Sequence, residues 1–194
     1  MGKIFYLMGK SASGKDTLYK KVLETNPDLK TVVLYTTRPM REGEKDGVEY
    51  HFCAPERLRE FERQGKLIEI RTYHTVLGPW SYATVDDGQI DLGSSSYLVI
   101  GTLESYGKMR EYFGSDVMVP LYIHVDDGVR LMRALARERK QKEPNYAELC
   151  RRYLADDADF SKENLEQYKI GRYFENHNLE ECLREINEVI FLYR

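Results

Sequence analysis

Residues 9–17, GKSASGKDT, form the stretch that decides the fold of this chain. An apolar run at 3–8 precedes them and predicts a buried strand. Residues 16–25 follow with apolar side chains at helical spacing, until Asn26 and Pro27 end the predicted helix. A glycine-rich loop between a strand and a helix binds phosphate, because its backbone N–H groups curl around an anion and the helix N-terminus adds partial positive charge.

The loop matches the phosphate-loop pattern G-x-x-x-x-G-K, and Lys15 can reach the β- and γ-phosphates of a nucleotide. Its next position holds Asp16, where serine or threonine usually binds Mg²⁺. A bare carboxylate would repel phosphate, so we expect Asp16 to be a direct Mg²⁺ ligand. The alternative is a glycine-rich turn with a helix-capping aspartate. The candidate nucleotide-binding residues are Gly9, Lys10, Ser11, Ala12, Ser13, Gly14, Lys15, Asp16 and Thr17.

The chain has 194 residues and a net charge of -3, with 29 lysines and arginines against 32 aspartates and glutamates. This length suits one α/β domain, and the slight acidity argues against a protein that coats nucleic acid. Three widely spaced cysteines, Cys53, Cys150 and Cys182, indicate neither a disulfide framework nor a zinc site. Since no apolar run in the sequence reaches membrane-spanning length, we expect a cytoplasmic protein with no membrane partner.

A second chemical signal follows the first helix. Residues 31–37 are β-branched and apolar, and they predict the second strand of a parallel sheet. The polar loop after it carries Arg38 and Arg41, and the chain then returns with Tyr50. Because guanidinium groups bind phosphate oxygens bidentately, these residues predict a phosphate clamp, to which the tyrosine adds a hydroxyl donor. The alternative is an ordinary solvated charged loop.

With the phosphate loop, the pattern T-T-R-x-x-R-x-G-E-x-x-G-x-x-Y-x-F at 36–52 resembles guanylate kinases, a family of nucleoside monophosphate kinases. The resemblance is dense over 4–18 and 36–52 and can be followed thinly to the C-terminus. It implies a P-loop α/β fold of three layers, with a parallel sheet flanked by helices, as the alternation of strands and helices also predicts. The implied single domain, 1–194, has a core at about 1–35, 93–132 and 153–194, a monophosphate-binding insertion at about 36–92 and a lid at about 133–152.

The resemblance also implies an acceptor site for GMP. Arg38, Arg41 and Tyr50 match residues that hold its phosphate, although the serine that the family has four positions before the first arginine is Leu34 here. Glu69, in the apolar strand 67–70, matches a glutamate that accepts hydrogen bonds from guanine; the alternative is an edge residue facing water. The implied GMP-binding residues are Arg38, Arg41, Tyr50, Glu69, Tyr82, Thr84 and Thr102.

The end of the strand at 97–102 departs from the family. An L-D-x-D pattern there supplies one carboxylate for the metal and one for guanine, but Ile100 and Thr102 occupy those positions here. We therefore expect the metal-binding charge to have moved to Asp16. Thr102 can accept a hydrogen bond from the base only weakly, and Glu104 is a second candidate.

The basic segment 129–142 is predicted to be a helix with Arg133 and Arg137 opposite its apolar face. The alternative is an ordinary solvated face. The resemblance implies that these arginines, with Arg152 across a lid turn at 140–145, stabilise the transferring phosphoryl group. It makes Lys15, Arg133 and Arg137 the catalytic residues and places Asn176 near the adenine of ATP. The predicted apolar face is Leu131, Met132, Leu135 and Ala136.

Periodicity and turn residues predict the remaining elements. A short helix is expected at 85–92, after a β excursion at 73–84. The last helix is expected to begin at a capping-box-like pair, Asn178 and Glu181. The other predicted elements are helices at 55–65, 103–113 and 163–168, and strands at 117–125 and 172–176.

The function implied by the resemblance is ATP-dependent phosphorylation of GMP or dGMP with Mg²⁺, with small nucleotides rather than nucleic acid as partners. Two alternatives remain at this stage. Loss of the second guanine-reading carboxylate leaves open a kinase for ribose 1,5-bisphosphate. A non-catalytic guanylate-kinase-like interaction module is also conceivable, although such modules tend to lose the loop lysine and lid arginines that are present here.

Overall fold

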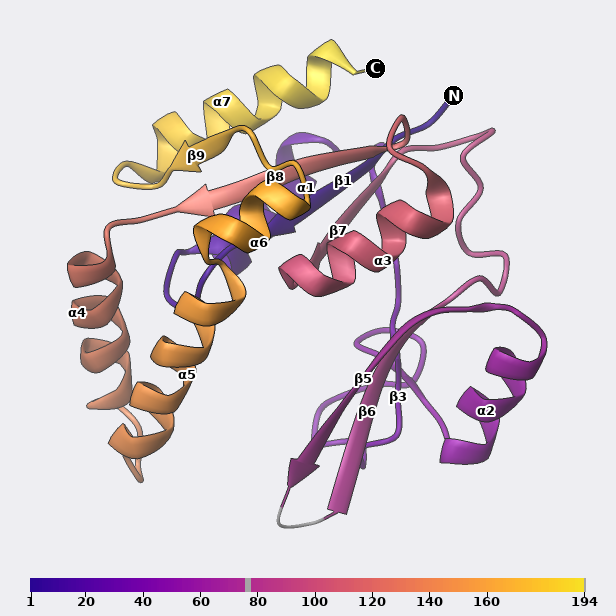
Figure 1. Cartoon of the computed structure of the whole chain (residues 1–194), viewed down its shortest axis with the longest axis horizontal. Helices are drawn as coiled ribbons and strands as arrows, with labels where there is room; N and C mark the ends of the chain where they lie inside the picture. Colours follow the sequence, from indigo (N-terminus) through magenta and orange to yellow (C-terminus); the bar gives the residue numbers. More distant parts are fainter. Residues whose placement is uncertain (76–77, 194) are drawn as a thin grey trace.

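Two β-sheets organise the chain in the computed structural model, which describes residues 1–75 and 78–193 (Figure 1). All neighbouring strands of the larger sheet are parallel. The larger sheet has the order β2 (Lys30–Thr31), β7 (Tyr97–Gly101), β1 (Ile4–Met8), β8 (Met118–His124) and β9 (Tyr173–Glu175). The smaller has the order β4 (His51–Phe52), β3 (Tyr35–Thr36), β6 (Gly78–Val85) and β5 (Leu67–Thr75).

Seven helices are present among the described residues, and several begin where a polar side chain accepts a backbone N–H. Thr102 accepts from Ser105 at the start of α3, and Asn178 accepts from the N–H groups of Glu180 and Glu181 at the start of α7. The helices are α1 (Lys15–Thr25), α2 (Pro55–Arg63), α3 (Leu103–Phe113), α4 (Asp127–Glu138), α5 (Tyr146–Asp159), α6 (Lys162–Gln167) and α7 (Leu179–Leu192).

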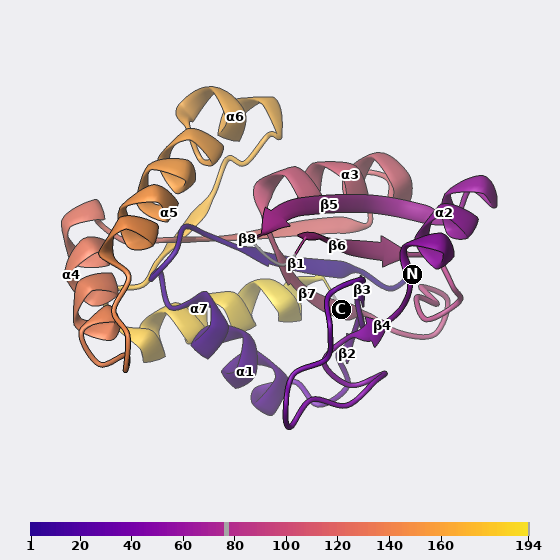
Figure 2. The same ribbon diagram turned by 90° about the horizontal axis from the view of Figure 1, so that it is seen from below.

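Strand β1 is buried along its whole length at the centre of the larger sheet, which explains its continuous apolar run. Phe5 and Leu7 pack against α1 and α7 on one face, whereas Tyr6 and Met8 pack against α3 on the other. Figure 2 shows the sheet between these two layers of helices. The predicted three-layer arrangement with a parallel sheet is therefore confirmed. None of the described helices is both long enough and apolar enough to span a membrane.

The smaller sheet lies beside the α3 side of the larger one, and Ile68 of β5 belongs to the same apolar cluster as α3. Helix α2 covers its other side, where Leu58 and Phe61 pack against Ala83 and Val85 of β6. On the opposite side of the molecule from α2, α4 and α5 form a helical pair (Figure 1). The predicted β excursion is thus the antiparallel β5–β6 hairpin, whose residues 76–77 lie outside the described part.

The predicted single strand at 31–37 is wrong. It is two short strands in different sheets, because the chain leaves β2 of the larger sheet and enters β3 of the smaller one. Between them, the side chain of Gln89 replaces a strand partner: it accepts from the Val33 N–H at 2.7 Å and donates to the Val33 carbonyl at 3.2 Å. β-branched composition cannot distinguish one long strand from two that separate.

The predicted short helix at 85–92 is also wrong. Val85 ends β6, and the chain continues through bends and turns. Gly88 has a φ of +92°, in the left-handed region, and Asp87 accepts from the Gln89 N–H within this turn.

The predicted apolar face of α4 is wrong as well. Leu131 and Met132 are 41% and 65% exposed, whereas Arg130 is only 1% exposed. The helix turns this arginine inward because Asp127, Asp156 and Asp157 surround it. Polar contacts from α5, far along the sequence, therefore override the local apolar pattern.

Candidate active site

The phosphate loop begins where β1 ends and turns into α1 at Gly14, whose φ is +86°. A Cβ at Gly9 would lie 2.6 Å from the carbonyl oxygen of Ile123, and a Cβ at Gly14 would lie 2.5 Å from Nδ2 of Asn176. Both positions therefore require glycine. Asn176 is buried and donates to the Ser13 carbonyl at 2.7 Å, so its amide stabilises the loop itself.

Lys15 is the first residue of α1 and is half-buried, whereas Asp16, in the same turn, is exposed. Among the described residues, neither charged group has a hydrogen-bond or ion-pair partner. The described residues also contain no group of three or more aspartate, glutamate, histidine or cysteine side chains that could hold a metal. Any Mg²⁺ here would take one or two protein oxygens and complete its shell with water and phosphate, which is how this ion usually binds.

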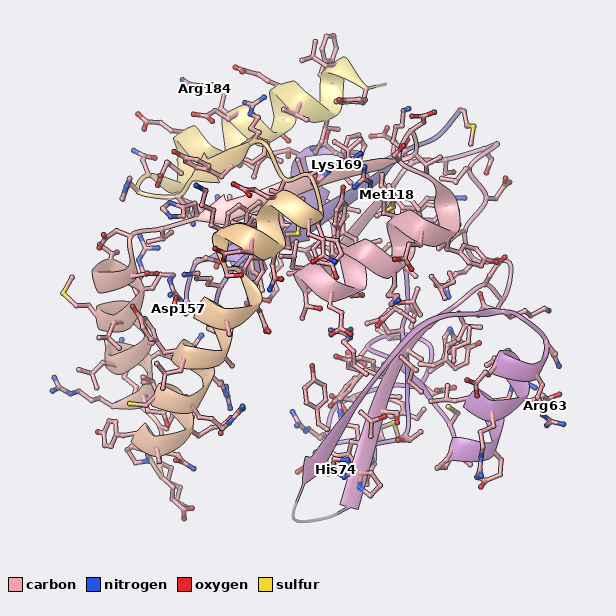
Figure 3. All side chains as sticks on the ribbon, viewed as in Figure 1. Arg63, His74, Met118, Asp157, Lys169 and Arg184 are labelled. Atoms are coloured by element: carbon pink, nitrogen blue, oxygen red, sulfur yellow. The ribbon has the colours of Figure 1, made fainter. Side chains whose placement is uncertain are left out.

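Acidic side chains of α4 and α5 contact the phosphate loop. Lys10 Nζ lies 2.5 Å from Asp157 and 3.4 Å from Asp127, and Asp156 accepts from the Ser11 N–H at 2.8 Å. Asp157 is labelled in Figure 3, on the α5 side that faces the loop and α4. These contacts connect the phosphate loop to the pair of helices α4 and α5.

Arg130 is a buried residue beside the phosphate loop that the sequence analysis missed. Its Nη1 donates to the Ser11 carbonyl at 3.1 Å, and its Nε and Nη2 donate to Asp127 at 2.9 and 2.6 Å. Its guanidinium also lies over the Tyr153 ring, 4.7 Å from the ring centre. The sequence signal was an aspartate three residues before an arginine on a helix, a spacing that pairs them.

The three predicted lid arginines lie on this side but not together. Arg133 Nη2 donates to the carbonyl of Asn176 at 3.2 Å, next to the phosphate loop. Arg137 and Arg152 line a pocket of 150 Å³ between α4 and α5, which Ser11 also lines. Arg152 and Arg151 both pair with Glu148, and hydrogen bonds from Arg151 and Arg152 lower the pKa of this glutamate to about 2.

The predicted phosphate clamp lies on the loop between β3 and β4. Arg38 is buried and donates to both oxygens of Glu44, at 2.8 and 2.5 Å, and its guanidinium lies 5.1 Å from the Tyr50 ring centre. Glu44 also accepts from the Arg41 N–H at 2.7 Å. The hydrogen bonds from Arg38 and Arg41 lower the pKa of Glu44 to about 2.

Tyr82 joins this group from β6. Its ring packs edge-on against Tyr50, with 5.6 Å between ring centres, and against Tyr73 at 5.9 Å. The structure therefore brings Arg38, Tyr50 and Tyr82 together, while Arg41 is exposed at the edge of the group. The sequence analysis missed Glu44 as the partner that orients Arg38.

The predicted base-reading residues converge from three strands. Glu69 of β5 is buried, and it accepts from the Thr84 hydroxyl of β6 at 2.8 Å. Arg71, two residues further along β5 and therefore on the same face, places Nε 3.1 Å from Glu69 and Nη1 3.4 Å from the Thr102 hydroxyl. Sequence reasoning missed Arg71, although the spacing of two from a buried glutamate was a usable signal.

A cleft of 550 Å³ opens beside these residues. We call it the β5–α3 cleft, because β5 forms one wall and the start of α3 another. The residues that line it include Arg71, Tyr73, Thr102, Glu104, Asp159 and Tyr168. Burial, with the charges of Asp156 and Glu104, raises the pKa of Asp159.

The glycine loop at the carboxyl end of a central parallel strand, with helices on both faces, places the chain in the class of P-loop α/β proteins. Within this class, residues 1–88 match the model of the guanylate kinase family, so the resemblance seen in the sequence is confirmed. The guanylate kinase of Neisseria gonorrhoeae is 36% identical over 106 residues, which are 55% of this chain and 50% of that protein.

Two other comparisons extend over almost the whole chain. The guanylate kinase of Cupriavidus pinatubonensis is 26% identical over 97% of this chain and 82% of its own length. A crystal structure of guanylate kinase from Anaplasma phagocytophilum has a TM-score of 0.62 at 24% identity, with 98% of this chain and 85% of that chain covered. At this identity the structural likeness shows the fold. The chain spans half the length of the first curated relatives that it matches.

Proposed function

We propose that this protein is an ATP-dependent kinase that phosphorylates GMP or dGMP. The observation that carries the proposal is the buried Glu69 carboxylate, hydrogen-bonded to Thr84 beside the β5–α3 cleft, in a molecule whose loop matches G-x-x-x-x-G-K. A buried carboxylate favours a ligand that offers several N–H donors, and the guanine edge offers N1–H and N2–H₂. Guanylate kinases among the relatives support the same substrate.

Phosphoryl transfer requires positioning and charge neutralisation more than covalent chemistry. Lys15 and the loop N–H groups would bind the donor phosphates of ATP. Arg38, held by Glu44, would bind the acceptor phosphate with Arg41, and the hydroxyl groups of Tyr50 and Tyr82 would add donors. No general base is required, because a monophosphate is already ionised at neutral pH.

The arginines of α4 and α5 would neutralise the charge that develops on the transferring group. Arg137 and Arg152 line one pocket with Ser11 of the loop, and Arg133 lies next to the loop through Asn176. We propose that 133–152, which runs from the middle of α4 to the middle of α5, is the lid. We propose that 36–92, which includes α2 and nearly all of the smaller sheet, is the monophosphate-binding insertion. Closure of such a lid excludes water from the reacting phosphates.

Asp16 and the loop fit a magnesium ion bound mainly through phosphates and water. The carboxylate is exposed at the start of α1 and has no partner among the described residues, so it is available as a ligand. Thr17, also exposed, places a hydroxyl in the same turn. Bound Mg²⁺ would offset the negative charge of the ATP phosphates, which removes the repulsion that Asp16 alone would exert.

The first experiment is an ADP-release assay with Mg-ATP and six acceptors: GMP, dGMP, AMP, CMP, UMP and ribose 1,5-bisphosphate. We expect turnover with GMP and dGMP only. Turnover with another acceptor alone would contradict the assignment of the base. ATP binding without turnover of any acceptor would instead favour the interaction module, against which the intact Lys15 and lid arginines now argue.

A further inference from the structure

Arg71 is a basic residue that lines the β5–α3 cleft, and the proposed function leaves it without a role. Its side chain is 17% exposed, compared with 2% for that of Glu69, so the arginine presents the larger polar surface to the cleft. It lies between two of the predicted base-reading groups, with Glu69 on one side and Thr102 on the other.

The hydrogen bonds of Arg71 leave donors available for a ligand. A guanidinium has five N–H groups and no acceptor. Three contacts are made within the protein: Nε to Glu69 at 3.1 Å, Nη2 to Glu69 at 3.4 Å and Nη1 to Thr102 at 3.4 Å. The two remaining N–H groups, one on each Nη atom, are free among the described residues, and the group as a whole lines the cleft.

The charges around the cleft indicate what kind of ligand these donors meet. Glu104 and Asp159 line the cleft together with Arg71, and Arg71 is already paired with the carboxylate of Glu69. The second phosphate of a sugar bisphosphate, if it lay in this cleft, would face net negative charge. A neutral ring with hydrogen-bond acceptors would not, which argues for a base and against a sugar bisphosphate.

We infer that Arg71 is a base-reading residue that donates hydrogen bonds to O6 of guanine; the inference rests on the proposed function. Guanine carries donors at N1 and N2 and acceptors at O6 and N7, and arginine is well matched to these acceptors. Glu69 and Arg71, adjacent on one face of β5, supply a complementary acceptor and donor. Adenine has an amino group in place of O6, so its donor would face the donors of Arg71.

A hydrogen bond from Arg71 to guanine also explains how the cleft could bind the base without the two carboxylates that guanylate kinases have at the positions of Ile100 and Thr102. The Thr102 hydroxyl contacts Arg71 at 3.4 Å, so the strand end orients the arginine. Recognition of a purine with an oxygen at position 6 then depends on the Arg71 donor on β5. It replaces the carboxylate acceptor that the family has at the end of the strand corresponding to β7.

The test is equilibrium binding of GMP, IMP and AMP without ATP, measured by calorimetry on the wild-type chain and on Arg71→Leu. IMP keeps O6 but lacks the 2-amino group. We expect Arg71→Leu to weaken binding of GMP and IMP by about 10-fold to 100-fold and to leave AMP within about 3-fold, so that discrimination against AMP is lost. The matched control is Arg63→Leu, at an exposed arginine in the last turn of α2 (labelled in Figure 3), which should change nothing.

A second measurement needs no variant and covers the case in which Arg71→Leu fails to fold. On the wild-type chain, 6-thio-GMP, whose sulfur is a weak acceptor in place of O6, should bind at least about 10-fold more weakly than GMP. The inference would be overturned if Arg71→Leu weakened the binding of GMP, IMP and AMP equally, or if the wild-type chain bound 6-thio-GMP as tightly as GMP. In either case, turnover of GMP by the wild-type chain would still uphold the proposed function. If the wild-type chain binds ATP but none of the acceptor nucleotides, both fail together.

Discussion

The phosphate loop follows the buried central strand of the larger sheet, whereas the β5–α3 cleft lies beside the smaller, partly exposed sheet. In the loop, backbone geometry is decisive. Gly9 and Gly14 leave room for Ile123 and Asn176, and the backbone N–H groups of a loop of this kind can bind an anion. In the cleft, side chains from β5, β6 and the end of β7 must meet. A contiguous motif builds the first region, and a tertiary network builds the second.

This difference has a consequence for mutation. Replacement of Lys15 should affect one chemical role, because its side chain has no hydrogen-bond or ion-pair partner among the described residues. A change in the cleft or the clamp should also affect its partners, because Glu69 is bonded to both Thr84 and Arg71, and Glu44 to Arg38 and Arg41.

Replacement of the loop lysine should have the largest effect. If the proposed function holds, Lys15→Ala should lower kcat for GMP phosphorylation by about 100-fold to 1000-fold, since it removes the cation proposed to stabilise the transferring phosphates. Steady-state ADP release measures this, and Lys20→Ala, an exposed lysine on the same helix, is the matched control. If the Lys15 variant kept full turnover, the assigned catalytic site would be refuted.

Replacement of the buried glutamate should come next. Glu69→Gln should weaken GMP binding by about 10-fold to 100-fold, because it replaces one acceptor oxygen with a donor amide beside Arg71. Binding of ATP should be unchanged if the two regions are independent. Calorimetry with each nucleotide checks both statements, with the exposed Glu62→Gln of α2 as control. A matching loss of ATP binding would contradict the separation of the two regions.

Replacement of the predicted metal ligand should have a smaller effect that added magnesium can rescue. Asp16→Asn should raise the Mg²⁺ concentration for half-maximal activity by about 10-fold, because a neutral amide is a poorer ligand than a carboxylate. A Mg²⁺ titration of turnover at constant ATP measures the shift. Glu24→Gln, exposed on the same helix, serves as control. An unchanged titration curve would remove Asp16 from the metal site.

The smallest effect should be a pH-dependent one in the clamp. Because hydrogen bonds from Arg38 and Arg41 lower the pKa of Glu44 from 4.5 to about 2, its stabilising contribution is present above pH 4.5 and is lost as the pH falls toward 2. The Tm of Glu44→Gln should therefore lie below that of the wild type at pH 6, and the two should converge near pH 2. Glu42→Gln, in the same loop, should follow the wild type at every pH; a Tm difference for Glu44→Gln that stayed constant with pH would disprove the pairing.

Much of the fold could be predicted from the sequence. The strand before the phosphate loop, helix α3 and the start of α7 at Asn178 were all placed correctly. These features depend on periodicity, caps and glycines, which are local. The clamp candidates came from the loop sequence and the base-reading candidates from the family resemblance. The structure pairs Thr84 with Glu69 and places Arg71 between Glu69 and Thr102.

The sequence by itself determined the phosphate loop, because nine consecutive residues carry its glycines, its lysine and the start of its helix. Only the tertiary structure decided that the strand predicted at 31–37 divides between two sheets, that Arg130 turns inward and that Arg71 contacts Thr102. In each of these cases the deciding partner is a hydrogen-bonding or charged group brought up by the fold. Gln89 holds Val33 across the gap between sheets, Asp156 approaches from α5, and Thr102 approaches from the end of β7. Local propensity cannot anticipate such partners, because their energy depends on distances that exist only once the chain has folded.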